Sequence, residues 1–204
     1  MLNKIADYKI VPVVKIDNAE DALPLAEALI EGGLPIAEIT FRTDAAERSI
    51  REIRKHTGLL VGAGTVNTVD QAKIALDAGA NFIVTPGFSR KVTEFVINNN
   101  VPIFPGACTP TEILYLMEYD LSIAKFFPAE QYGGLNTIKA LSGPFPNIKF
   151  MPTGGISEDN IVSYLQFPQI IACGGSWMVK DKLIREHKFD EIIQLTSRAV
   201  KLVK

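Results

Sequence analysis

Three polar side chains occur at alternate positions of one short, otherwise apolar segment, residues 37–42, which reads AEITFR. Successive side chains of a β-strand point to opposite faces, so Glu38, Thr40 and Arg42 share one face. A charge on a buried face is costly unless it is solvated or has a partner. The spacing therefore predicts that a carboxylate, a hydroxyl and a guanidinium project into one site. The alternative is a Glu38–Arg42 pair that satisfies itself.

A lysine lies within a second apolar segment, residues 123–130, which reads IAKFFPAE. Burial disfavours the charged form of Lys125 and favours the neutral amine that attacks a carbonyl carbon. The alternatives are a lysine that reaches solvent and one that holds a phosphate as a point charge. A carboxylate near an amine nucleophile combines covalent activation with proton transfer, which a metal-free aldolase or decarboxylase requires.

Two segments near the end of the chain contain double glycines: residues 151–157 read MPTGGIS and residues 172–177 read ACGGSW. Glycine lets backbone N–H groups approach a ligand closely. Two such segments after neighbouring predicted strands favour a phosphate cradle, and the alternative is a pair of ordinary turns.

These residues need elements that bring them together, and the chain alternates short β-branched or aromatic runs with helical patterns, as βαβ units do. The predicted strands are residues 10–16, 37–42, 59–62, 82–85, 102–106, 123–127, 149–153 and 170–174. The predicted helices are residues 18–31, 43–56, 67–78, 89–98, 110–118, 133–141, 157–165 and 188–202. Candidate N-caps are Asn18, Thr43, Asn67, Ser89, Thr109 and Ser157. Eight units close most simply into a single (β/α)8 TIM barrel, with an open doubly wound sheet as the alternative. In such barrels the active site lies at the carboxyl ends of the strands.

The composition fits one α/β domain over residues 1–204. The 21 basic and 23 acidic residues give a net charge of −2 and are scattered, which disfavours nucleic acid and membrane partners. Two cysteines favour a reducing cytoplasm over a disulfide framework. His56 and His187 lack the neighbours of a metal site, and the GAGT segment at residues 62–65 lacks the third glycine of a dinucleotide fingerprint. We therefore expect no metal and no cofactor.

Six segments together resemble the family of 2-keto-3-deoxy-6-phosphogluconate (KDPG) aldolases, also called KHG/KDPG aldolases. They are GGLPIAEITFR (32–42), VGAGTV (61–66), TPG (85–87), KFFPAE (125–130), MPTGGIS and GGSW. The resemblance covers nearly the whole chain. It implies a class I aldolase that reversibly cleaves KDPG to pyruvate and glyceraldehyde 3-phosphate, often also 4-hydroxy-2-oxoglutarate to pyruvate and glyoxylate, and commonly a homotrimer.

The resemblance also implies residue roles. Lys125 would form the imine, and Glu38 would move protons through water. Arg42, Thr65 and Pro86 would contact the carboxylate end of pyruvate, and Phe127 and Thr153 would line the pocket. The phosphate would be held by Gly154, Gly155, Gly174, Gly175 and Ser176.

Three positions of the chain differ from the family pattern or vary within the family. Asp120 stands where many members have glycine, and Ala124 replaces a bulkier neighbour of Lys125. Lys15 is a position where relatives carry arginine or an apolar residue. We hypothesise that it is a second cation near the substrate carboxylate that favours the neutral form of Lys125 by like-charge repulsion; a solvent-exposed lysine is the alternative.

Three other functions are alternatives to a KDPG aldolase. A 6-phosphogalactonate-type aldolase shares the chemistry and differs at one hydroxyl configuration, although Arg42 favours the gluconate type. A non-catalytic phosphosugar-binding barrel is disfavoured by the presence of both Glu38 and Lys125. An isomerase or epimerase would use acid–base or metal chemistry, for which a lysine in an apolar strand is not needed.

Overall fold

Eight short β-strands alternate with helices over residues 2–204, the part of the chain that this computed structural model describes. The strands are β1 (Ile10–Val14), β2 (Ile36–Thr40), β3 (Leu60–Gly64), β4 (Phe82–Val84), β5 (Ile103–Phe104), β6 (Ile123–Phe126), β7 (Lys149–Pro152) and β8 (Cys173–Gly175). Each strand overlaps one predicted strand, so the predicted alternation of strands and helices is confirmed.

Every predicted helical region contains a helix. These helices are α2 (Ala22–Glu31), α3 (Ala46–His56), α4 (Val69–Asp77), α5 (Arg90–Asn98), α6 (Pro110–Glu118), α7 (Gly134–Ser142), α8 (Ile161–Leu165) and α10 (Phe189–Val203). Two short helices were not predicted, α1 (Leu2–Tyr8) and α9 (Asp181–Arg185), and two 3-10 turns cover Ala19–Asp21 and Glu130–Tyr132. Both unpredicted helices are short, and α1 has a single buried residue, Ile5, which gives little periodicity to detect.

All strand pairs between these elements are parallel. One six-stranded sheet has the order β5-β4-β3-β2-β1-β8, and β6 and β7 form a second, two-stranded sheet. Isolated bridges join the two sheets at both sides, between Gly106 and Lys125 and between Thr153 and Gly174. The fold is therefore a mixed α/β fold with parallel strands, as predicted.

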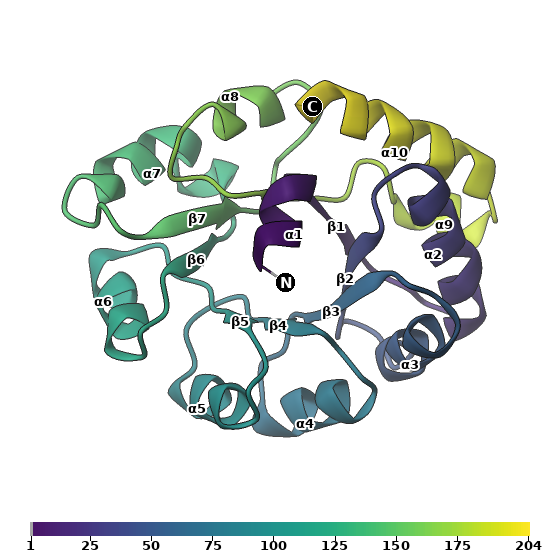
Figure 1. The fold of residues 1–204 in the computed structure, drawn as a ribbon, viewed down its shortest axis with the longest axis horizontal. Helices are drawn as coiled ribbons and strands as arrows, with labels where there is room; N and C mark the ends of the chain where they lie inside the picture. Colours follow the sequence, from purple (N-terminus) through teal and green to yellow (C-terminus); the bar gives the residue numbers. More distant parts are fainter. Residues whose placement is uncertain (1) are drawn as a thin grey trace.

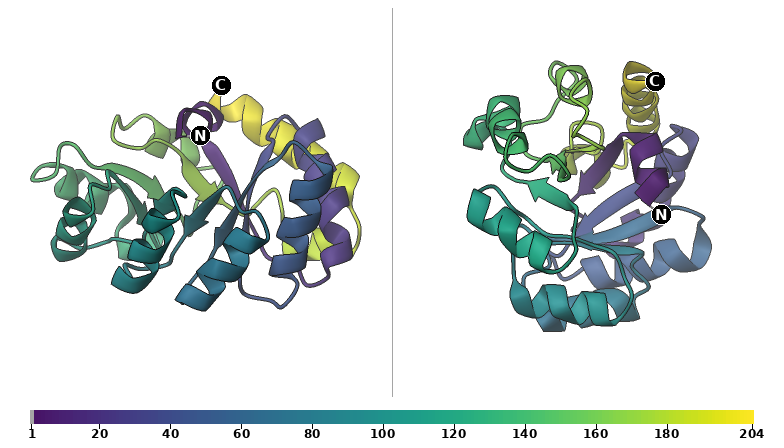
Figure 2. Two further views of the ribbon diagram at one scale, coloured as in Figure 1. Left: turned by 60° about the horizontal axis from the view of Figure 1, so that its bottom comes forward. Right: turned by 60° about the vertical axis from the view of Figure 1, so that its left-hand side comes forward.

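Most helices surround the strands on the outside, whereas α1 lies over the middle of this ring (Figure 1). The two further views also show helices outside the strands (Figure 2). The strands are almost entirely buried because helices cover their outer faces. Four phenylalanines are the largest fully buried side chains of this core, and two of them, Phe126 and Phe150, meet edge to face at 6.5 Å between ring centroids. The frame around the strand ends is consequently a close-packed apolar core.

Two predicted strand limits were wrong near the candidate site. β2 ends at Thr40, so Arg42 lies in the following turn rather than on the strand face shared by Glu38 and Thr40. β3 continues to Gly64, two residues past the predicted end of this strand at residue 62. The alternating pattern of residues 37–42 runs past the last ladder residue of β2, whereas the glycines of β3 carry no side chains that could mark where that strand ends.

Candidate active site

Glu38 lies in the middle of β2 and is completely enclosed, with 1% of its surface exposed. Its strand pairs with β1 and β3, and Glu38 stands opposite Val13 on one side and Gly62 on the other. Two residues further along β3, a methyl group on Gly64 would lie 2.0 Å from Glu38 Oε1. The bare backbone of Gly64 therefore makes the room that the carboxylate occupies.

Lys125 lies in β6, on the opposite sheet, and is 4% exposed. Its backbone is fixed from the β5 side, because its N–H donates to Pro105 O at 2.9 Å and its carbonyl accepts from Ala107 N at 2.9 Å. Its ammonium group, Nζ, donates to Glu38 Oε1 at 3.1 Å and lies 5.4 Å from the centroid of the Phe127 ring. The structure thus brings together the two residues that sequence analysis placed at the centre of the site.

The ion pair between Lys125 and Glu38 is a weak argument for stability and a strong one for chemistry. Removing two charges from water costs several kcal/mol per ion, which the attraction between Lys125 and Glu38 repays only with good geometry and further hydrogen bonds. The second carboxylate oxygen, Glu38 Oε2, is buried and has no hydrogen-bond partner among the described residues. A buried carboxylate with one free oxygen beside an amine is a candidate proton donor and acceptor. The alternative prediction of a Glu38–Arg42 pair is wrong, because the partner of Glu38 is Lys125.

A cavity of about 310 Å³ opens at the carboxyl ends of the strands. Nine of the predicted site residues line it: Lys15, Arg42, Phe127, Thr153, Gly154, Gly155, Gly174, Gly175 and Ser176. They come from the ends of β1, β2, β6, β7 and β8, so strands far apart in the sequence supply one pocket. Phe127 follows β6 directly; it lines this cavity, and its ring also lies beside the ammonium group of Lys125.

The two double glycines lie side by side in this cavity. Gly154 and Gly155, which we call the glycine turn, have left-handed φ angles of 97° and 78°, which non-glycine residues adopt only with strain. Gly174 faces Thr153, because a methyl group on Gly174 would lie 2.3 Å from Thr153 Oγ1. Both segments therefore present backbone instead of side chains to the cavity, as a phosphate cradle requires.

Two cationic side chains line the same cavity. Arg42 is exposed in the turn after β2. Lys15 is half-buried, and its Nζ lies 2.6 Å from Asp17 Oδ1 and 3.9 Å from Asp181 Oδ2. Arg185 also reaches Asp17, at 3.4 Å. Lys15 is thus neither free in solvent nor unpaired, and it belongs to a small charge network at the rim.

Four predicted residues are not among the lining residues of this cavity: the buried pair Glu38 and Lys125, and also Pro86 and Thr65. Pro86 lines a second cavity of about 330 Å³, which shares Phe127 with the first and also contains Cys108. Thr65 follows β3 with a left-handed φ of 55° and is not among the lining residues of either cavity. A non-glycine residue in this conformation directly after Gly64 marks a constrained strand end beside Glu38.

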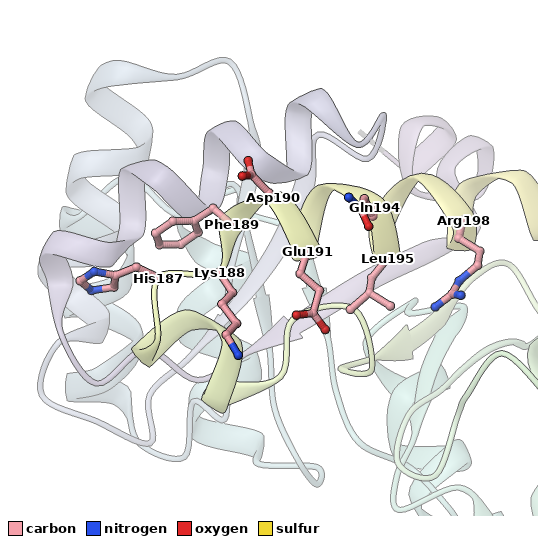
Figure 3. A pocket seen from close by; sticks show the side chains of 8 residues that line it. All are labelled: His187, Lys188, Phe189, Asp190, Glu191, Gln194, Leu195 and Arg198. Atoms are coloured by element: carbon pink, nitrogen blue, oxygen red, sulfur yellow. The ribbon is translucent and has the colours of Figure 1, made fainter.

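A larger hollow of about 960 Å³ runs along α10 from His187 to Arg198 (Figure 3). It contains none of the predicted site residues, and the polar side chains at its two ends already have partners, since Arg198 lies 3.1 Å from Glu158 and His187 lies 3.1 Å from Asp21. Within residues 2–204, no three His, Cys, Asp or Glu side chains are grouped so that they could hold a metal ion. In the same part of the chain, no helix has the length and apolarity to cross a membrane.

Two contributors to the site were not predicted. Gly64 lies beyond the predicted end of its strand and was not singled out, although a glycine inside a strand is itself a signal of close approach. Cys108 was not singled out, but its sulfur accepts from Phe127 N at 3.3 Å and donates to Phe127 O at 3.1 Å. Cys108 therefore clamps the backbone of the residue that connects the lysine to the cavity.

The fold and the site define a class: an α/β enzyme with a buried lysine–carboxylate pair and an adjacent glycine-lined pocket at the strand ends. Comparison with known proteins agrees with this class. The sequence model of the KDPG and KHG aldolases matches residues 1–195, and the chain belongs to this family.

Among its relatives, the 2-dehydro-3-deoxy-phosphogluconate aldolase of Haemophilus influenzae is 46% identical over 100% of this chain and 97% of its own. The KDPG aldolase of Legionella pneumophila, whose crystal structure has pyruvate captured at low pH as a covalent carbinolamine intermediate, has a TM-score of 0.93 and 37% identity, covering 97% of this chain and 96% of its own. The 2-keto-3-deoxy-6-phosphogluconate aldolase of Zymomonas mobilis ZM4, solved with 3-phosphoglycerate, has a TM-score of 0.91 and 32% identity, covering 98% and 95%.

Proposed function

We propose that this protein is a class I aldolase that reversibly cleaves KDPG to pyruvate and glyceraldehyde 3-phosphate, and that it also cleaves 4-hydroxy-2-oxoglutarate to pyruvate and glyoxylate. The observation that carries the proposal is the buried contact of 3.1 Å between Lys125 Nζ and Glu38 Oε1. An amine nucleophile needs an adjacent base to become neutral, and this contact supplies one directly. Relatives that share most of the chain are KDPG aldolases, and one of them holds pyruvate as a carbinolamine.

The geometry suggests the order of the proton transfers. Lys125 passes a proton to Glu38, and the neutral amine then attacks the keto carbon to form a carbinolamine. Loss of its hydroxyl as water, with a proton returned by Glu38, gives the imine. Glu38, now a carboxylate again, takes the proton of the substrate hydroxyl next to the breaking bond, and the protonated imine accepts the electron pair of the carbon–carbon bond. The aldehyde leaves, an enamine remains, and the protonated Glu38 can donate to the enamine carbon. Protonation of the enamine carbon and hydrolysis release pyruvate and restore Lys125.

The remaining predicted residues would bind the two charged ends of the substrate. Arg42 has the planar fork that grips a carboxylate with two parallel hydrogen bonds, and Thr65 and Pro86 would lie at the same end. Phe127 and Thr153 would line the space between the ends. The glycine turn, with Gly174, Gly175 and Ser176, would hold the phosphate through backbone N–H groups and one hydroxyl. Nine of the predicted residues line one cavity, which supports binding of both charged ends of one substrate there.

Lys15 remains a hypothesis of its own. Its place in the cavity supports a second cation near the bound substrate, while its pairing with Asp17 reduces the charge that it presents. The test is Lys15→Met, with the KM for KDPG and the pH profile of kcat as readouts. Unchanged values in both would end the hypothesis.

The galactonate epimer is the alternative substrate, because it offers the same keto group and the same phosphate. Arg42 favours the gluconate type by resemblance. Both epimers should be assayed side by side with the same enzyme preparation. A higher kcat/KM for the galactonate epimer would reassign the substrate without changing the mechanism.

We further propose that the two sheets form one closed eight-stranded (β/α)8 barrel, which residues 1–204 build as a single domain. The bridges between Gly106 and Lys125 and between Thr153 and Gly174 support closure. Resemblance to the family favours a homotrimer, which light scattering tests. The two cysteines are free, which supports a reducing compartment such as the cytoplasm.

The deciding experiment is reductive trapping. The protein is incubated with pyruvate, reduced with borohydride and digested, and the adduct is located by peptide mass spectrometry. We expect one adduct on Lys125, with the mass of pyruvate less one oxygen atom, and none in Lys125→Met. A Lys15→Met variant is the matched control and should still form the adduct. An adduct on another lysine, or none in the parent protein, would contradict the assigned nucleophile.

A further inference from the structure

Glu130 packs against the glycine turn without lining the cavity of about 310 Å³; it lines a separate cavity together with Gly134 and Tyr164. A methyl group on Gly155 would lie 2.4 Å from Glu130 Cγ and 2.7 Å from its Cβ, so the carbon chain of Glu130 packs against the second glycine. The backbone N–H of Glu130 also donates to Gly154 O at 3.2 Å. The position of the turn therefore depends on where the Glu130 side chain is held.

Tyr164 holds that side chain in place. Its hydroxyl donates to Glu130 Oε1, and Tyr164 itself is only 2% exposed on α8. A methyl group on Gly134, the first residue of α7, would lie 2.6 Å from the Tyr164 hydroxyl and 2.9 Å from Glu130 Oε1, so the contact is enclosed on this side too. Burial, followed by the Glu130 carboxylate, raises the pKa of Tyr164, and the phenol stays a donor throughout the neutral range. Without this bond, the exposed tip of Glu130 would regain rotamer freedom.

We propose that Tyr164 is a positioning residue for phosphate recognition, because it fixes Glu130 against the glycine turn and thereby presets the backbone that faces the substrate phosphate. This inference rests on the proposed function of that turn. Backbone donors bind an anion best when they need no rearrangement on binding. Loss of the Tyr164 hydroxyl should consequently weaken the binding of a phosphorylated substrate and leave the chemistry at Lys125 unchanged.

The test compares two substrates that differ in phosphate. For Tyr164→Phe we expect the KM for KDPG to rise about threefold to tenfold, as the loss of one hydrogen bond implies, with kcat within about twofold. The KM for 4-hydroxy-2-oxoglutarate, which carries no phosphate, should not change. The matched control is Tyr119→Phe, which removes another tyrosine–glutamate bond, from Tyr119 to Glu94 Oε1 at 2.7 Å, between α5 and the end of α6. It should leave both substrates unaffected.

A Glu130 series separates positioning from general damage and replaces Tyr164→Phe if that variant does not fold. Glu130→Gln keeps the carbon chain and an oxygen that accepts the tyrosine hydrogen bond, so its KM values should match the parent protein. Glu130→Ala removes both and should reproduce the effect of Tyr164→Phe on KDPG alone. Equal losses for the two substrates, or no change for either, would overturn the inference.

A failure of the proposed function can be distinguished from a failure of the inference about Tyr164. If the parent protein cleaves neither substrate, the proposed activity is wrong, and binding of inorganic phosphate can still be followed. The only tryptophan, Trp177, packs where a side chain on Gly175 would be, 1.9 Å from its nearest ring carbon, so its fluorescence reports on the cradle. Weaker phosphate binding in Tyr164→Phe than in Tyr119→Phe then supports the inference, and equal binding overturns it.

Discussion

Gly64 Cα faces the carboxylate of Glu38 so closely that a single methyl group on Gly64 would lie 2.0 Å from Oε1 and 2.5 Å from Cγ. The two residues belong to neighbouring parallel strands, in which Thr40 is the partner of Gly64. The carboxylate of Glu38, the proposed proton carrier, therefore occupies space that exists only because β3 has no side chain there. Positions of this kind control a reaction without touching the substrate.

The first prediction follows from this contact. Gly64→Ala should push the Glu38 carboxylate away from Lys125 Nζ and lower kcat by roughly two orders of magnitude, at the low end of what a positioned acid–base group contributes. Circular dichroism should show an unchanged fold. Gly58→Ala is the control, because nothing lies within 4 Å of a side chain there, and it should keep full activity. Full activity in Gly64→Ala would mean that Glu38 is not the proton carrier.

A second prediction concerns the carboxylate end of the substrate. Arg42→Lys keeps the charge but loses the planar fork, so the concentration of pyruvate needed for half-maximal trapping should rise about tenfold, the equivalent of one strong hydrogen bond. Arg48→Lys, an exposed arginine on α3, is the matched control and should behave as the parent protein. An unchanged pyruvate dependence in Arg42→Lys would remove Arg42 from the binding site.

The residue types of the central pair could be predicted from the sequence, but their contact could not. A carboxylate and a lysine inside apolar strands are unusual wherever they occur, and this was enough to single out Glu38 and Lys125. They are separated by 87 positions and lie in different sheets, so their contact depends on how the strand ends are arranged in space. The predicted alternation of strands and helices identified the strands that carry Glu38 and Lys125, but it did not give the distance between the two side chains.

Local exceptions were harder to predict because their causes are tertiary. Thr43 was a candidate N-cap, yet its hydroxyl donates to Ile16 O instead of capping α3. The N-cap of α4 is Thr68 rather than the predicted Asn67.

Asp120 stands where the resemblance implies glycine in many family members, and the backbone gives a reason. Its φ is 54°, in the left-handed region that glycine adopts without strain and that aspartate tolerates better than most residues.

A third prediction concerns stability and uses two N-caps of different quality. Thr109 caps α6 with a reciprocal capping box, in which its hydroxyl accepts from Glu112 N while Glu112 Oε2 accepts from Thr109 N at 2.9 Å. Thr109→Ala should lower the free energy of unfolding by about 1 kcal/mol. Ser89 is the N-cap of α5 without such a bond, so Ser89→Ala should cost only a few tenths of a kcal/mol. Urea denaturation of both variants measures the difference, and equal losses would contradict the capping argument.

The last prediction concerns the pH dependence of Cys108, whose sulfur clamps the backbone of Phe127. Burial, with a smaller contribution from the Glu112 carboxylate, raises the pKa of the Cys108 thiol from 9.0 to about 11. The thiolate is the form that reacts, so at pH 8 the native protein should react with iodoacetamide at Cys108 about a hundredfold more slowly than an ordinary thiol, and the rate should rise about tenfold per pH unit up to about pH 11.

The same shift has a defined sign for stability. Because the folded state holds the thiol proton more tightly than the unfolded state, this contribution is fully present below pH 9.0 and is lost as the pH rises toward about 11. In guanidinium, both Cys108 and Cys173 should react at the ordinary rate, which mass spectrometry of the labelled peptides can follow. Rapid labelling of Cys108 in the native protein at pH 8 would contradict the burial of its thiol beside Phe127.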